Sequence, residues 1–168
     1  MNNIISPEKI ELLEAEVKQL RGRYNPRSVK DLVEIARKEY GVRHVVRTPL
    51  VHHDVFGWVD GDPPIILYYS EFRFLEVYAL AHEIGHVALG HLDRNKARLP
   101  LEQGEAEADY FAYSLTRVSP LKVNLYATID IILDLMFLMT DESKEREKKL
   151  LLELGVPPVE VEKLALFA

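Results

Sequence analysis

Residues 71–92 read EFRFLEVYALAHEIGHVALGHL, and the interpretation of the whole chain starts from this stretch. Its apolar side chains recur at the spacing of an α-helix. They are Phe74, Leu75, Tyr78, Ala81, Ile84, Gly85 and Ala88. We therefore predict one long helix from Glu71 to Leu92, with these residues on its buried side.

Two histidines lie four residues apart in that helix. His82 and His86 project from the same face, so their imidazoles can close on one ion. Zinc suits this pair because it accepts imidazole nitrogen at about 2.0–2.1 Å and tolerates an open tetrahedral site. Glu83 lies about 100° around the helix from His82, which is a poor position for a ligand. It can, however, reach a water molecule beside the metal, so the segment predicts two zinc ligands and a general base.

A third ligand is needed, because two histidines and a glutamate on a helix can also be ordinary packed and surface residues. Residues 105–112 read EAEADYFA and fall in the next predicted helix, from about Leu101 to Arg117. Glu105 and Asp109 are again four residues apart and face the same way. Glu105 can bind the metal while Asp109 accepts an N–H from a ligand histidine. Glu107 stays open as an alternative ligand, although residues two apart on a helix point in different directions.

A further histidine follows the pair closely. His91 lies five residues after His86, whereas the pattern H-E-x-x-H-x-x-G-x-x-H requires six, so the metzincin class is excluded. His91 can stabilise an oxyanion or cap the end of the helix, where a cation is favoured, and we prefer the cap. Tyr110 and Tyr113 are the other candidate oxyanion donors.

The N-terminal part of the chain predicts two helices. Ser6 and Pro7 are typical of a helix start, and Ser28 with Asp31 forms the pattern of a capping box at a second start. Gly41 is placed to end the second helix.

Three short runs of β-branched and aromatic residues come next, at 42–47, 55–59 and 65–69. Asp60-Gly61-Asp62-Pro63-Pro64 is a strong turn signal between the last two. We expect a small, three-stranded, largely antiparallel sheet beside a mainly helical body, which is an α+β fold.

Helical patterns continue to the end of the chain, over about 119–139 and 140–155, with a short last turn after Pro157-Pro158. We divide the chain into a domain at 1–118, with the N-terminal helices, the sheet and the two motif helices, and a helical C-terminal extension at 119–168 that packs on it.

Composition narrows the possible functions. The net charge of -6 argues against direct nucleic-acid binding, which needs a concentrated cationic face. Without cysteine, a metal must be held by histidine and carboxylate. Residues 129–139 are too short to span a bilayer and include Asp130 and Asp134, so we expect a cytoplasmic protein without membrane contact. This apolar stretch is either buried or forms a partner or homodimer contact.

Two motifs taken together resemble those of the ImmA/IrrE family of metallo-endopeptidases: YALAHEIGHVALGH at residues 78–91 and EAEADYFA at 105–112. The resemblance covers about residues 28–118. It implies a zincin-like body in which the histidine helix follows a small sheet and a downstream glutamate, here Glu105, is the third ligand. It also implies a cytoplasmic peptidase that cleaves a specific regulatory protein, such as a helix-turn-helix transcriptional repressor.

The main rival hypothesis is a catalytically silent zinc-binding protein that only binds a repressor partner. Glu83 argues against it, because a structural zinc site needs no base beside an open position. For a peptidase, we expect the substrate to add as a strand along residues 65–69, as the edge of the sheet. Trp58, Tyr68 and Phe72 are candidates for the lining of the cleft.

Overall fold

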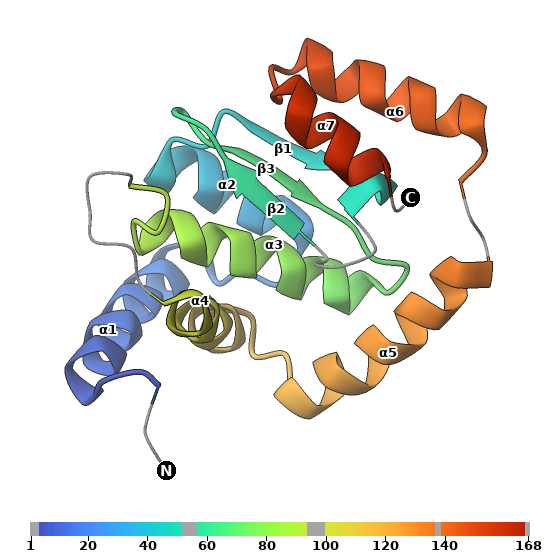
Figure 1. Cartoon of the computed structure of the whole chain (residues 1–168). Helices are drawn as coiled ribbons and strands as arrows, with labels where there is room; N and C mark the ends of the chain where they lie inside the picture. Colours follow the sequence, from blue (N-terminus) through green and yellow to red (C-terminus); the bar gives the residue numbers. More distant parts are fainter. Residues whose placement is uncertain (1–3, 52–56, 94–99, 137–138, 167–168) are drawn as a thin grey trace.

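The computed structural model describes residues 4–51, 57–93, 100–136 and 139–166, with the side chains of 130–136 left out of the description. Helices surround a small sheet (Figure 1), which confirms the predicted α+β class. The helices are α1 (Pro7–Tyr24), α2 (Val29–Tyr40), α3 (Arg73–Ala88), α4 (Leu101–Thr116), α5 (Pro120–Met136), α6 (Asp141–Glu153) and α7 (Pro158–Ala165). The strands are β1 (His44–Arg47), β2 (Gly57–Asp60) and β3 (Ile65–Tyr68), and a 3-10 turn, η1 (Pro49–Val51), follows β1.

Local capping signals start the first two helices where they were predicted to start, although α1 continues through Gly22, which was expected to help end it. Ser6 accepts a hydrogen bond from the backbone N–H of Lys9 at the start of α1. Ser28 and Asp31 form the reciprocal capping box of α2, and Gly41 ends that helix at a φ of 64°. The predicted helix 71–92 is too long at both ends, because α3 begins at Arg73 and ends at Ala88.

The sheet is mixed rather than largely antiparallel. β3 lies in the middle, parallel to β1 and antiparallel to β2. The prediction that residues 65–69 form the edge is therefore wrong. All four residues of β3 are buried, and its unbroken apolar sequence is typical of a strand covered on both faces. β2 contacts α3, the helix that carries the two histidines, and it lies at an edge of the described sheet.

The two faces of the sheet contribute to different clusters of buried side chains. Ile66 and Tyr68 face the larger core, which is shared with α1 to α4. Ile65 and Leu67 face a smaller cluster, to which the C-terminal segment contributes. The contributed side chains are Leu151, Val156 and Val161. The last two helices thus cover the face of the sheet opposite the histidine helix (Figure 1).

Among the described residues, α3 and α4 make the most extensive contact between two elements. Gly85 lies where a Cβ would come within 3.2 Å of both the Ala108 Cα and the Phe111 side chain. The absence of a side chain at Gly85 therefore allows the two motif helices to approach closely enough to share one site.

We expect Gly85→Ala to lower the free energy of unfolding by about 1–3 kcal/mol, because the added methyl group forces α3 and α4 apart. Thermal unfolding measures this loss. Gly22→Ala is the matched control, since its Cβ would meet nothing within 4 Å. That change should leave stability unchanged or raise it by up to about 1 kcal/mol. Equal melting temperatures for the two variants would contradict the packing described for Gly85.

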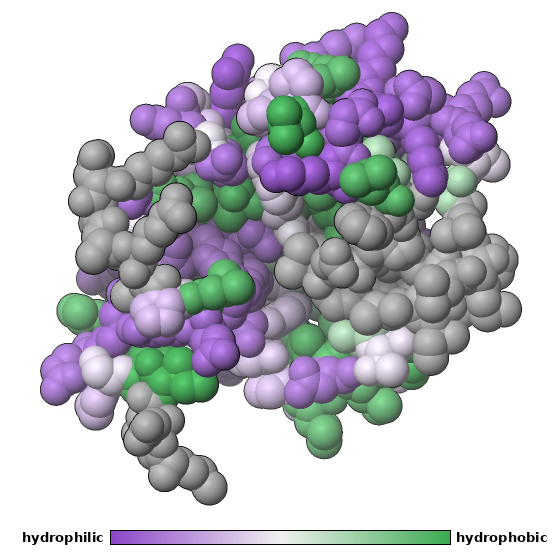
Figure 2. Space-filling view, viewed as in Figure 1, coloured by the Kyte–Doolittle hydropathy of each residue, from purple (hydrophilic) through white to green (hydrophobic). Residues whose placement is uncertain are grey.

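Charged side chains dominate the outer surface of α6, whereas hydrophobic side chains project from the lower edge where α5 begins (Figure 2). Leu121 and Leu125 are the exposed large side chains of that part of α5. The prediction for 129–139 rests mainly on side chains outside the described residues. Within the described parts of the chain, no helix is long and apolar enough to cross a bilayer.

Candidate metal centre

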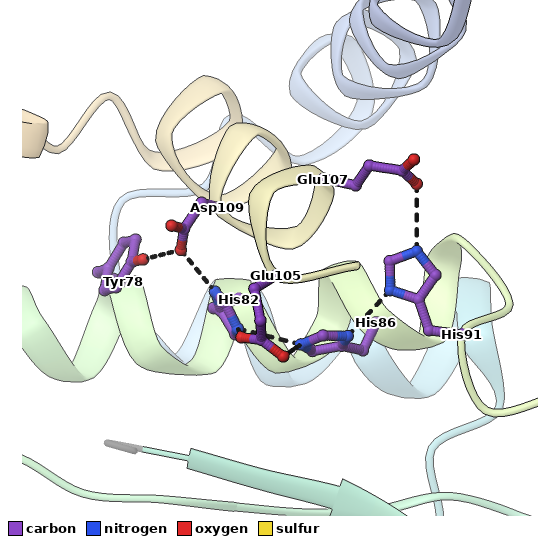
Figure 3. A network of polar contacts seen from close by, with 7 residues as sticks. All are labelled: Tyr78, His82, His86, His91, Glu105, Glu107 and Asp109. Carbon is purple, nitrogen blue, oxygen red and sulfur yellow. Dashed lines mark hydrogen bonds and ion pairs between the residues drawn. The ribbon is translucent and has the colours of Figure 1, made fainter. Parts of the chain in front are cut away.

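The two motif helices bring His82, His86 and Glu105 together (Figure 3). The Nε2 atoms of the two histidines lie 3.0 Å apart. The Glu105 carboxylate lies 3.2 Å from Nε2 of His82 and 3.5 Å from Nε2 of His86. Two imidazole nitrogens and a carboxylate oxygen therefore converge from α3 and α4, and this donor set fits a divalent cation such as zinc.

Asp109 lies behind the first histidine, as its spacing from Glu105 predicts. Its Oδ1 is 2.9 Å from Nδ1 of His82 and also accepts a hydrogen bond from the Tyr78 hydroxyl. A carboxylate on Nδ1 keeps a proton at that nitrogen and leaves Nε2 free to bind a cation. Burial alone would raise the pKa of Asp109, but the hydrogen bonds from His82 and Tyr78 outweigh it and lower this pKa.

Without a cation, the cluster is arranged to hold a proton. Burial would lower the pKa of His82, but the hydrogen bonds to Asp109 and Glu105 outweigh it and raise this pKa to about 10. Burial and the positive charge of His82 lower the pKa of His86 to about 4. A cation would bind Nε2 of His82 only in its deprotonated form, so cation binding would compete with the protonation that this raised pKa favours.

Glu83 lies beside the three converging side chains and is buried, with 6 % of its surface exposed. A Cβ on Gly57 of β2 would come within 2.8 Å of the Glu83 Cδ, so the glycine leaves the space that this carboxyl occupies. Both residues line a cavity of about 770 Å³ together with His82, His86 and Glu105. The predicted base and the predicted ligands therefore open onto the same cavity.

Burial raises the pKa of Glu83 to about 7, with His82 opposing the rise and Glu105 adding to it. The unfolded chain ionises this group near about 4.3, so ionisation costs the folded state nothing below that pH. The cost grows as the pH rises through both values and is complete above about 7. In metal-free protein, the ionised carboxyl of Glu83 therefore destabilises the fold at neutral and alkaline pH.

We expect Glu83→Gln to stabilise the metal-free protein relative to the wild type, increasingly as the pH rises. Between about pH 5 and pH 8 the difference in unfolding free energy should widen by about 2.5 kcal/mol. Chemical denaturation of both proteins in a chelator measures it. A difference that stays constant with pH would contradict the raised pKa of Glu83.

Glu107 was the alternative third ligand, and its side chain points away from the cluster. It is 1 % exposed and contacts His91, Gln103 and Lys9 instead. Burial would raise the pKa of Glu107, but these hydrogen bonds outweigh it and lower the pKa. Of the two glutamates, Glu105 is therefore the one that joins the histidines.

The backbone N–H of His91 donates to the carbonyl of His86 at the end of α3, but its side chain does not cap the helix. Its side chain lies between His86 and Glu107, with Nδ1 2.9 Å from Nδ1 of His86 (Figure 3). Burial lowers the pKa of His91, and the hydrogen bond to Glu107 only partly opposes this. The contact between His91 and Glu107 could not be predicted from the sequence, because it depends on how α4 packs beside the turn after α3.

The other side chains considered for the cleft are distributed differently. Trp58 lines the cavity, whereas Tyr68 is buried in the core. Phe72 packs edge-to-face on Tyr126. Of the two tyrosines considered as oxyanion donors, Tyr110 donates a hydrogen bond to Glu14 and Tyr113 stacks on Tyr78. Among the described residues, Trp58 is thus the one of these aromatic side chains that borders the cavity.

Comparisons with protein-family models, with curated proteins and with solved structures returned no match for this chain. The candidate cation site therefore rests on the donor geometry of His82, His86 and Glu105. The group can hold a metal ion.

Proposed function

We propose that this chain is a zinc-dependent endopeptidase that hydrolyses a peptide bond in a specific regulatory protein. The observation that supports this most strongly is the buried Glu83 carboxyl, which opens onto the same cavity as the three converging donors. A site that only held a structural ion would need neither a buried carboxyl beside it nor an accessible cavity. The motif resemblance to ImmA/IrrE metallo-endopeptidases supports the same reaction class.

In this proposal His82, His86 and Glu105 hold the cation, which when bound supplies Lewis-acid activation of water and of the scissile carbonyl. Glu83 accepts the proton of the attacking water and delivers it to the leaving nitrogen. Glu83 suits this role because its buried carboxyl opens onto the same cavity as the three converging donors. Asp109 holds the His82 ring in the orientation that cation binding requires.

Substrate binding is assigned to β2 in place of residues 65–69. This strand lies at an edge of the described sheet, and Gly57, Trp58 and Val59 line the cavity. An extended peptide that pairs with β2 would lie along the cavity that Gly57 and Glu83 both line. A helix-turn-helix repressor is the proposed protein substrate, on the strength of the motif resemblance.

The experiment is a cleavage screen with zinc-loaded protein against the purified products of neighbouring genes and against an extract of the source cells. New N-termini are identified by mass spectrometry. We expect a small number of cleavage sites that disappear with a chelator and return when zinc is restored. The absence of new termini in every arm would contradict the proposal.

A further inference from the structure

The imidazole of His86 has a second partner opposite the converging donors. Its Nε2 faces His82 and Glu105, whereas its Nδ1 lies 2.9 Å from Nδ1 of His91, in the turn that follows α3. The remaining nitrogen of His91, Nε2, lies 3.2 Å from Oε2 of Glu107 on α4. These contacts form an unbroken path from Glu107 through His91 to His86 (Figure 3).

The chemistry of a cation site fixes the direction of the hydrogen bonds along this path. A neutral imidazole has one N–H and one lone pair, and His86 must offer the lone pair of Nε2 to bind a cation. Its proton is then on Nδ1, which donates to His91. For His91 to accept at Nδ1, its own proton must be on Nε2, which faces the carboxylate of Glu107. Both hydrogen bonds are therefore donated in the same direction, from His86 to His91 and from His91 to Glu107.

Glu107 is held in place by residues from two helices. Gln103 donates to its Oε1 at 2.9 Å, and the Lys9 ammonium lies 3.2 Å from its Oε2. A buried carboxylate is costly unless it is paired and hydrogen-bonded, and here a cation from α1 and an amide from α4 meet that need. The carboxylate is therefore a fixed acceptor for His91.

We propose that His91 and Glu107 are positioning residues for the cation site. Glu107 fixes the tautomer of His91, and Nδ1 of His91 accepts a hydrogen bond from the Nδ1–H of His86. His82 receives the equivalent support directly from Asp109. This inference rests on cation binding by His82, His86 and Glu105, which is one part of the proposed function, and does not depend on peptide hydrolysis.

The test measures zinc affinity by competition with a chromophoric chelator in wild type, His91→Phe and Glu107→Gln. Phenylalanine keeps a ring of similar size but cannot accept a hydrogen bond from the Nδ1–H of His86. We expect zinc affinity to fall about 10- to 100-fold in His91→Phe, the range for lost outer partners of metal-binding histidines, and measurably in Glu107→Gln. His44→Phe is the matched control, since His44 begins β1 away from the cavity, and should bind zinc as the wild type does.

Long-range proton–nitrogen NMR of the zinc-loaded wild type provides a readout that a merely structural role would not produce. We expect His86 to carry its proton on Nδ1 and His91 on Nε2. An Nδ1-protonated His91, or affinities of both variants equal to that of the wild type, would overturn the inference while leaving the cation site intact. Failure of the wild type itself to bind zinc would overturn both.

Discussion

Replacing Glu83 with glutamine is expected to lower peptide-bond cleavage by about 10²–10⁴-fold, which is the usual contribution of a positioned general base. Glutamine keeps the size of the side chain but cannot accept the proton of the attacking water. Because Glu83 is not among the converging donors, zinc should remain bound. The measurement is the cleavage rate of the substrate found in the screen, with zinc content determined on the same samples.

Glu102→Gln is the matched control for this change. Glu102 is an exposed residue in the first turn of α4, so its replacement removes the same charge close to the site without touching the cavity. We expect wild-type cleavage from this control. Undiminished cleavage by Glu83→Gln with zinc bound would rule out Glu83 as the general base.

Removal of the Glu105 carboxylate should have the second large effect, this time on metal binding. Glu105→Ala deletes one of the three proposed ligands, so its zinc affinity should fall by more than the loss of about 10- to 100-fold that is typical of an outer partner. Zinc should consequently raise the melting temperature of this variant much less than that of the wild type, because ligand stabilisation follows the ratio of free ligand to dissociation constant.

Glu102→Ala again provides the control, since it removes an exposed glutamate one turn earlier on the same helix. Equal zinc-induced shifts in melting temperature for Glu105→Ala and Glu102→Ala would show that Glu105 is not a ligand. Loss of the shift in Glu105→Ala alone would distinguish it from the other acidic residues of α4.

Structural features that depend on residues close together in the chain could be predicted from the sequence alone. The capping box of Ser28 and Asp31 and the stop at Gly41 depend on residues within a few positions of one another. The same is true of the pairs on α3 and α4, whose four-residue spacing places them on one helix face. The approach of Glu105 to the two histidines followed from these periodicities, together with the need for a third ligand.

Features set by tertiary packing could not be predicted. Which strand lies at the edge depends on pairing between distant segments, and the buried sequence of β3 fits a central strand better than an edge. The contact of Glu107 with Lys9 joins α4 to α1, and no local pattern indicates it. The burial of Glu83 likewise depends on Gly57, which comes from a separate strand.

Binding of zinc to the purified, metal-free protein tests the central claim most directly. Calorimetric titration followed by zinc X-ray absorption should show one zinc per chain, with two imidazole nitrogens at about 2.0–2.1 Å and a carboxylate oxygen at about 2.0–2.2 Å. The double variant His82→Ala/His86→Ala should lose this binding. No zinc uptake by the wild type, or equal uptake by the double variant, would contradict the assignment of the site to His82, His86 and Glu105.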